Sequence, residues 1–346
     1  MDNRSIPVIA AALLLSMCCC VTALGLAIGA VLLPRIGGPW LGPEPTTAPV
    51  VIVTSTPVPT ITRTPTPVPM GVHTSATSVE RSTEETLAKT SIPERDLIAL
   101  TARLKKIDQP IPVVVNETPP HYALGDQEVF WVSNLDTKTY YTTTATLSYV
   151  TPHLYLWVEE GVEVDQDALQ RSAERFENQT YPTNREFFGS EWTPGVDNDP
   201  HINILQATGL GSTIAGYYSA ADEYSRLVNP YSNEREMFYI NSDRLQPGTA
   251  AYDSVLAHEF QHMIHWAVDR NEDTWVNEAF SELASYLNGY DVSGFYRTFT
   301  ETPDTQLTTW PDGPGQASAN YGASFLFAAY FLERFGEQAL RRVVSQ

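Results

Sequence analysis

The segment "LAHEFQHMIH" at 256–265 brings together side chains that could bind a metal ion and use it. His258 and His262 lie four residues apart, so on a helix they project from one face and could hold one ion between two imidazoles. Glu259 lies about 100° around the helix from His258, beside the ion rather than on it. It could reach a zinc-bound water, as in a metal hydrolase. The other face is apolar, as in any amphipathic helix, through Leu256, Phe260, Ile264 and Ala267.

A second pair of acidic residues follows in "WVNEAFSELAS" at 275–285. Fifteen residues separate His262 from Glu278, which is enough to end one helix, turn, and bring a second helix alongside. Because catalytic zinc normally takes three protein ligands and leaves one position for water, we expect Glu278 to be the third ligand. Glu282, one turn later, is expected to accept the free ring N–H of a ligand histidine. The alternative is that both glutamates are solvated residues of an ordinary helix.

These two segments resemble the gluzincin metallopeptidases, in which H-E-x-x-H is followed by a ligand glutamate in an "N-E" on the next helix. The resemblance implies a zincin-like α+β domain, zinc on His258, His262 and Glu278, and Glu259 as the base. Glu282 is similar to a histidine-orienting carboxylate of that group. Within it, "HEFQHMIH" and "NYGASFLFAAYFLERFG" look most like the hyicolysin-type bacterial neutral metallopeptidases. The match is specific over about 250–290 and weaker over about 200–340.

One departure from the gluzincin pattern concerns the oxyanion. Gluzincin aminopeptidases carry a catalytic tyrosine three residues before a glycine that opens a late helix, but here that position is Ala319 and Tyr321 directly precedes Gly322. The G-x-M-E-N exopeptidase motif is also missing, and both points favour an endopeptidase. Tyr321 is the candidate oxyanion stabiliser, with packing as its alternative role. Three tyrosines of the long loop after residue 207 are rivals: Tyr217, Tyr218 and Tyr224.

Other possible ligands are less well placed. His265 follows His262 by three residues, so it is either a third histidine ligand or a histidine near the helix end. His121, His153 and His201 have no metal-binding spacing and are expected to be structural. The segment "VDNDPH" at 196–201 resembles a calcium-binding turn, which makes Ca²⁺ possible, although a plain Asx turn before a strand accounts for the same residues.

Hydrophobic periodicity predicts an α+β fold with a small mixed sheet. A helix is expected over 93–109, then three β-branched runs that form an antiparallel sheet, then a helix over 165–189. Two short strands, "HINILQA" and "EMFYINS", flank the long loop, and the rest is mostly helical, with one helix ending at Asn288-Gly289. The strand "HINILQA" or the loop after it is expected to form the edge along which a peptide lies.

The N-terminal part has a different composition. Residues 6–33 are uncharged and apolar over a length that can span a bilayer, so 1–35 reads as a membrane anchor, with a cleaved signal or a lipoprotein as alternatives. Residues 36–90 read as a disordered Thr/Pro-rich stalk. The body divides into a β-rich and helical part, 91–190, and a zincin-like catalytic part, 191–346. Because the sequence ends inside a helical pattern, we expect it to be a fragment, and a propeptide at about 80–120 remains open.

Charge and cysteine content limit the function further. Residues 91–346 contain 36 acidic and 16 basic residues, which accounts for the whole net charge of −20. Such an acidic body should repel nucleic acid, so we exclude nucleic-acid binding. All three cysteines lie at 18–20, so any metal in the body must bind histidines and carboxylates.

The sequence therefore predicts a zinc-dependent endopeptidase that acts on polypeptides. The N-terminal helix would hold it on a membrane with the body outside the cytoplasm, or release it as a secreted protein if that helix is cleaved. The main alternative is an inactive surface-displayed binding module that keeps a zinc-peptidase frame. A zinc hydrolase that cleaves a non-peptide amide is a third possibility.

Overall fold

The computed structural model describes residues 83–90, 95–311 and 316–344 of the chain. The expected membrane segment at 6–33 and most of the expected stalk lie outside these residues. Within the described part, no helix combines the length and the apolar character that a membrane crossing requires. The described residues belong to one compact unit, Arg81–Gln346.

One mixed sheet of six strands runs through this unit in the order β1-β2-β3-β4-β6-β5. The first three strands pair antiparallel, as predicted, but β3 continues the sheet by pairing parallel with β4, and β4 pairs parallel with β6. The sheet therefore crosses residue 190. The strands are β1 (Gln127–Asn134), β2 (Thr139–Thr151), β3 (Leu154–Glu159), β4 (Ile202–Ala207), β5 (Gly216–Tyr218) and β6 (Met237–Asn241).

Strand β5 lies inside the long loop and forms one edge of the sheet, antiparallel to β6. The strand "HINILQA" cannot be that edge, because it corresponds to β4, which has neighbours on both sides and is buried along its whole length. Of the two segments expected to provide a peptide-binding edge, the structure therefore leaves only the loop.

The helices account for the rest of the described chain and confirm the α+β class. The helix expected over 93–109 is shorter, and α8 was not predicted. In chain order the helices are α2 (Thr83–Lys89), α3 (Leu97–Leu104), α4 (Gln166–Arg175), the π-turn η1 (Phe176–Thr180), α5 (Tyr181–Phe188), α6 (Ala250–Val268), α7 (Thr274–Leu287), α8 (Ser293–Glu301), α9 (Ser318–Phe335) and α10 (Glu337–Val344).

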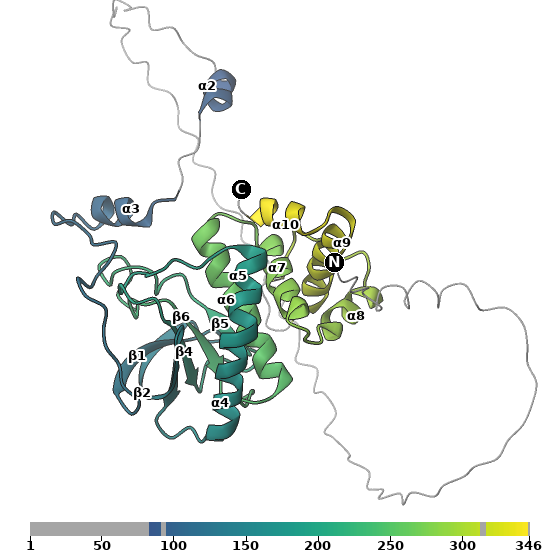
Figure 1. The fold of residues 1–346 in the computed structure, drawn as a ribbon. Coiled ribbons are helices and arrows are strands. Elements are labelled where there is room, and N and C mark those ends of the chain that lie inside the picture. Colours follow the sequence, from purple (N-terminus) through teal and green to yellow (C-terminus); the bar gives the residue numbers. More distant parts are fainter. Residues whose placement is uncertain (1–82, 91–94, 312–315, 345–346) are drawn as a thin grey trace, which may run out of the picture. The chain divides into compact units, whose positions relative to one another are not determined.

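Helices α4, α5 and α6 cover one face of the sheet, and α7 to α10 continue the helical layer from α6 (Figure 1). The main core lies between this face and the helices, where Leu156 and Ile204 of the sheet are fully buried with Leu256 of α6. A smaller core covers the other face around Trp157. Helix α6 thus lies between the sheet and α7, so its sides face different partners.

The seating of α6 fixes which of its sides faces α7. Thr249 caps its N-terminus, and Asp253 in its first turn accepts a hydrogen bond from Arg175 of α4 at 2.7 Å. Halfway along, the ring of Phe260 stacks on Tyr181 of α5, with centroids 5.5 Å apart. These contacts hold one side of α6 against α4 and α5, which leaves the histidine side turned toward α7.

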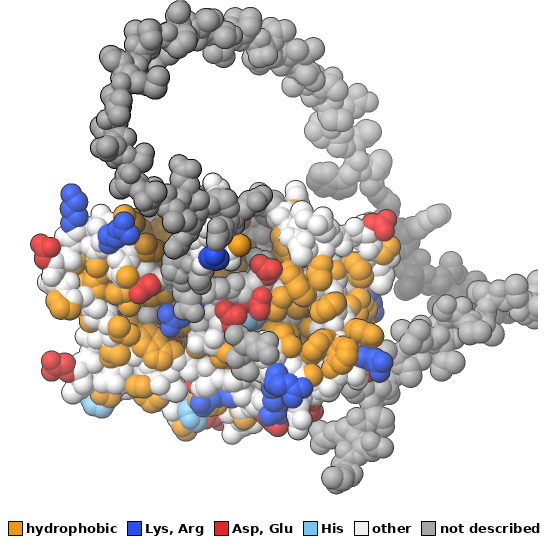
Figure 2. Space-filling view, turned by 90° about the horizontal axis from the view of Figure 1, so that it is seen from above, with side chains coloured by type: hydrophobic (Ala, Val, Ile, Leu, Met, Phe, Trp, Pro, Cys, Tyr) orange, Lys and Arg blue, Asp and Glu red, His pale blue; other side chains and the backbone are white. Residues whose placement is uncertain are grey.

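Apolar side chains also reach the surface. Figure 2 shows them grouped in patches between scattered charged side chains on one face of the molecule. Large exposed examples on α9 are Phe327, Tyr330 and Phe335.

Candidate metal centre

His258 and His262 leave the same side of α6, as their spacing predicts. Their rings meet edge to face with centroids 4.7 Å apart, and their Nε2 atoms lie 3.0 Å apart. Two nitrogen atoms that can each bind a metal are therefore directed to the same point between α6 and α7.

Helix α7 brings Glu278 to this point. Its Oε2 atom lies 3.4 Å from Nε2 of His258 and 3.5 Å from Nε2 of His262. This oxygen is buried and accepts no hydrogen bond. Within the described residues, only His258, His262 and Glu278 form a group of three such side chains whose ligand atoms all lie within 4.8 Å of one another. The group could hold a metal ion, and it consists of the three residues predicted as ligands.

The remaining ring nitrogens are bound to other side chains. Nδ1 of His258 lies 3.2 Å from Oε1 of Glu282, as expected for an orienting carboxylate, and Nδ1 of His262 lies 2.8 Å from Oδ1 of Asn277. Because both oxygens are acceptors, each Nδ1 carries a proton, and in the neutral rings each Nε2 presents a lone pair. When both rings are neutral, as metal binding requires, two lone pairs and the Glu278 oxygen converge with no donor among them. This arrangement fits a bound cation.

Asn277 and Ser281 support His262, although neither was predicted as a site residue. The hydroxyl oxygen of Ser281 lies 3.0 Å from Nδ1 of His262 and donates to Oε1 of Gln261 at 2.5 Å. Both Ser281 and Gln261 are fully buried. The spacing contained the signal, because positions 277, 278, 281 and 282 form one continuous strip on a helix. A helix that turns Glu278 toward the histidines carries the other three with it.

Opposite charges stabilise this group. Burial lowers the pKa of His258, but the Glu278 and Glu282 carboxylates beside its ring raise it well above the usual value. Burial also lowers the pKa of His262, and Glu278 again raises it. For Glu278, burial raises the pKa, whereas the two imidazoles together lower it far below the usual range. The carboxylate of Glu278 is therefore ionised at neutral pH, as a metal ligand must be.

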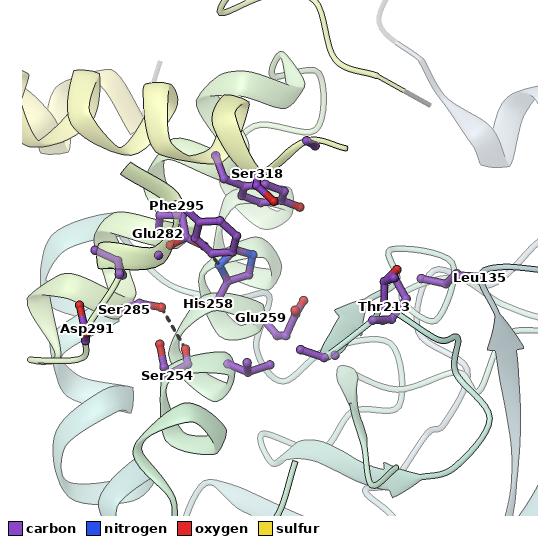
Figure 3. A pocket seen from close by; sticks show the side chains of 18 of the residues that line it. Leu135, Thr213, Ser254, His258, Glu259, Glu282, Ser285, Asp291, Phe295 and Ser318 are labelled. Atoms are coloured by element: carbon purple, nitrogen blue, oxygen red, sulfur yellow. Dashed lines mark hydrogen bonds and ion pairs between the residues drawn. The ribbon is translucent and has the colours of Figure 1, made fainter. Parts of the chain in front are cut away.

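Glu259 lies beside this group of three side chains and is 6% exposed. Burial raises the pKa of its carboxyl group, the two imidazoles lower it, and a backbone hydrogen bond from Tyr218 lowers it further. Since Tyr218 belongs to β5, the edge strand holds this carboxylate in place. Figure 3 shows Glu259 leaving the same helix as His258 and directed toward the side of the pocket where Thr213 lies.

A cleft of about 590 Å³ opens over these residues, and His258, Glu259 and Glu282 line it. Gly216 of β5 also lines the cleft, where a Cβ would meet the backbone carbonyl oxygen of Tyr239 at 2.7 Å. Because Gly216 and Glu259 line the same cleft, an extended chain lying along β5 would pass beside Glu259. The apolar part of the wall comes from separate parts of the chain: Leu135, Ile214, Val255, Val292 and Phe295.

Tyr321 lies in the first turn of α9 and lines the same cleft. Its ring packs against Phe295 and Trp310, with centroids 5.1 Å and 5.0 Å away, and lies 6.3 Å from the ring of His258. Burial raises the pKa of its hydroxyl well above the usual value, and nearby carboxylates, including a hydrogen bond to Glu278, raise it further. The structure thus brings this tyrosine to the ligand group as a protonated donor.

The rival tyrosines have their polar groups elsewhere. The hydroxyl of Tyr217 accepts a backbone N–H from β1 at 2.9 Å, and that of Tyr218 donates to Glu223 at 3.0 Å. The ring of Tyr224 packs edge-on against Trp266, with centroids 5.7 Å apart. None of the three lines the cleft, so only the backbone of Tyr218 is placed to contribute.

His265 lies in the core, outside the ligand group. Its Nδ1 atom is 3.4 Å from Nε2 of Gln261, and its ring centroid is 5.7 Å from that of Phe280. Burial lowers its pKa to about 4, so it is neutral at pH 7. Its ring nitrogens do not belong to the group of ligand atoms that lie within 4.8 Å of one another.

His153, His201 and the segment 196–201 have local partners. Nδ1 of His153 lies 2.6 Å from Glu177, and His201 contacts Asp199. In the segment 196–201, the carboxylate of Asp197 accepts the backbone N–H of Asp199 at 3.0 Å, which is the bond of an Asx turn.

Comparisons with protein-family models and with curated proteins found no match for this chain. The resemblance to gluzincins therefore stays a prediction, and the assignment of roles depends on the geometry of the cleft.

Proposed function

We propose that this protein is a zinc-dependent endopeptidase in which His258, His262 and Glu278 bind one Zn²⁺ and Glu259 is the general base. One observation carries the proposal: three acceptor atoms from two helices converge within 4.8 Å, with a second carboxylate directly beside them. Two imidazoles and one carboxylate are a common ligand set of catalytic zinc, and the cleft leaves space for water and substrate.

The choice of zinc follows from the donor atoms. Ca²⁺ and Mg²⁺ prefer all-oxygen sites, whereas two imidazole nitrogens favour a transition metal or zinc. The outer hydrogen bonds fit as well, because Glu282 and Asn277 each fix the tautomer of one ligand histidine.

A bound Zn²⁺ would supply an acidified water and an electrophile for the peptide carbonyl. Glu259 would accept the proton of that water during attack and return it to the leaving amine. The backbone N–H of Tyr218 keeps the Glu259 carboxylate turned toward the cleft during both transfers. The hydroxyl of Tyr321 would donate a hydrogen bond to the oxyanion.

Strand β5 would orient the substrate. It pairs with β6 on one side only, so its other side can pair with an extended peptide. We further propose that the body acts outside the cytoplasm on a membrane-anchored stalk, which is supported by the sequence of residues 1–90 alone.

The Glu259→Gln variant tests the assignment. It should keep zinc at one equivalent and lose casein hydrolysis by at least about a hundredfold, because only the base is removed. Glu301→Gln, an exposed glutamate of α8, is the matched control and should behave as wild type.

Three results would contradict the proposal. Hydrolysis retained by Glu259→Gln would remove this residue as the base. Wild-type protein that binds zinc but cleaves no peptide would instead favour the inactive binding module. Metal analysis of Glu278→Ala should find less bound zinc than in wild type. A full equivalent of zinc in that variant would mean that another side chain completes the site.

A further inference from the structure

A second group of buried carboxylates lies away from the metal centre. Glu223 lies in the loop after β5, and Glu236 directly precedes β6. Each side chain is 2% exposed, and each carboxyl group alters the pKa of the other, so the two face one another in the interior.

Each of these carboxylates has one oxygen with a donor and one without. Oε1 of Glu223 accepts the hydroxyl of Tyr218 at 3.0 Å, and Oε1 of Glu236 accepts the backbone N–H of Val196 at 2.7 Å. The Oε2 atoms of both are buried and meet no N–H or O–H donor from another residue, and the two carboxyl groups lie close enough to share a proton. Gly195 leaves room for this arrangement, because a Cβ there would overlap the carboxylate of Glu236.

The charge of Arg270 lowers the pKa of Glu223, but Arg270 forms no ion pair with either carboxylate. Among the described residues, neither Glu223 nor Glu236 forms an ion pair with Lys, Arg or His. The guanidinium of Arg235 instead lies 4.9 Å from the centroid of Phe130, and that of Arg270 lies 4.3 Å from the centroid of Trp266. Two buried carboxylates without a directly paired counter-charge are costly, so the pair must take up protons or a cation.

The surroundings add further negative charge. Burial, and to a smaller extent Asp222, raise the pKa of Glu223 to about 8, although hydrogen bonds with Glu236 and Tyr218 and the charge of Arg270 lower it. Burial also raises the pKa of Glu236, and Glu223 and Asp197 contribute to the increase. Asp222 accepts hydrogen bonds from the hydroxyl of Tyr239 and the backbone N–H of residue 233. The oxygens that lack such a donor are therefore those of the facing pair.

A cavity of about 210 Å³ reaches Glu223. Its wall includes Trp192, Tyr224 and Arg270, and its volume is enough for several water molecules. An ion at the facing pair would thus have a path of entry and water to complete its coordination.

We propose that Glu223 and Glu236 form a second metal site, separate from the histidine site, that binds one Ca²⁺. All donors there are oxygen atoms, which Ca²⁺ prefers, and its flexible coordination of six to eight oxygens accommodates two carboxylates supplemented by water. Zinc is disfavoured because neither histidine nor cysteine is present at the pair. The inference does not depend on the proposed peptidase activity.

Calcium binding by the full chain tests the site. After metal depletion and reloading with one equivalent of zinc, isothermal titration with CaCl₂ should show one further Ca²⁺ site, and Ca²⁺ should raise the thermal unfolding midpoint. Glu223→Gln and Glu236→Gln should each weaken Ca²⁺ binding by at least about tenfold, since ligand charge sets affinity in such sites. Glu301→Gln, with the same loss of charge at an exposed position, should bind Ca²⁺ as wild type does.

A pair that shares protons instead of an ion gives the opposite results. Wild-type protein would then show no Ca²⁺ binding at millimolar concentration and no shift of the unfolding midpoint, which overturns the proposal without any variant. Binding retained by both glutamine variants would overturn it as well.

Proton release provides a readout that does not require the variants to fold. Because bound Ca²⁺ must displace protons from groups with a raised pKa, binding by wild type should release protons at pH 7 and tighten toward pH 8. Binding without proton release would contradict the site. The charged and titratable groups that face the pair are Asp197, Tyr218, Asp222 and Arg270.

Discussion

Glu282 should control zinc affinity through His258, without touching the metal. The carboxylate is 4% exposed and lies 3.2 Å from Nδ1 of His258. A hydrogen bond to a charged group contributes about 1.5–3 kcal/mol and a neutral one about 0.5–1.5 kcal/mol. Glu282→Gln keeps an acceptor but loses the charge, so it should weaken zinc binding by about 1–1.5 kcal/mol, or about five- to twelvefold.

Glu282→Ala should have a larger effect, because it leaves the N–H of His258 unpaired in a buried site. The expected loss is about 2–3 kcal/mol, or about 30- to 150-fold in zinc affinity. Competition with a chromophoric chelator at fixed pH measures both constants, and circular dichroism checks that the variants fold. Glu301→Gln again serves as the control.

The order of the three affinities is the test: wild type, then glutamine, then alanine. If both variants bind zinc within twofold of wild type while remaining folded, Glu282 does not orient a ligand histidine. An alanine variant that binds more tightly than the glutamine variant would contradict the hydrogen-bond reasoning in the same way.

Three further predictions follow from the structure. Tyr321→Phe should lower kcat by about a hundredfold with zinc content unchanged, because one oxyanion donor is lost; an unaffected kcat would leave the ring with a packing role only. Gly322→Ala should lower the unfolding free energy by about 1–3 kcal/mol, since the new Cβ would overlap the carbonyl of Phe295 and lie 2.8 Å from Cα of Tyr296, and a stability equal to wild type in urea would refute that contact. Burial lowers the pKa of His265 to about 4, so its protonation does not change stability above pH 6.5. Between pH 6.5 and pH 4 the unfolded chain binds the proton and the folded chain does not. The free energy of unfolding should therefore fall by about 3 kcal/mol over this range. The His265→Gln variant should lose less stability over this range, and an identical pH profile for both proteins would exclude a buried neutral histidine.

The three residues that could hold a metal ion were predicted because helical geometry alone brings them together. Four-residue spacing places His258 and His262 together, and a short connection to the next helix brings Glu278 to the same side. Both helices have the apolar face that fixes their rotation against the core. The convergence of these side chains could therefore be predicted without information about distant parts of the chain.

Strand β5 could not be predicted, because three residues have no measurable periodicity. It exists as a strand only because β6, some twenty residues later, offers a free edge. The parallel pairing of β3 with β4 is hidden for a similar reason, since a crossover through α4 and α5 separates them.

Tyr321 and the facing glutamates depend on long-range packing. Tyr321 reaches the cleft because Gly322 lets α9 approach the backbone of α8, a helix that the sequence pattern did not reveal. Glu223 and Glu236 are thirteen positions apart, on a loop and at a strand start, and look like ordinary acidic surface residues in the sequence. Only the folded chain shows that both are buried.

Tyr218 contacts two buried carboxylates through different groups. Its backbone N–H contacts Glu259, and its hydroxyl contacts Glu223. A rotation of this single residue would release both carboxylates together. If both proposed metal sites exist, the occupancy of the calcium site would tune the alignment of the base, although no ligand is shared between the ions. Tyr218→Phe, which cuts only the hydroxyl contact, would separate the two: the backbone contact to Glu259 would remain, but its dependence on calcium would be lost.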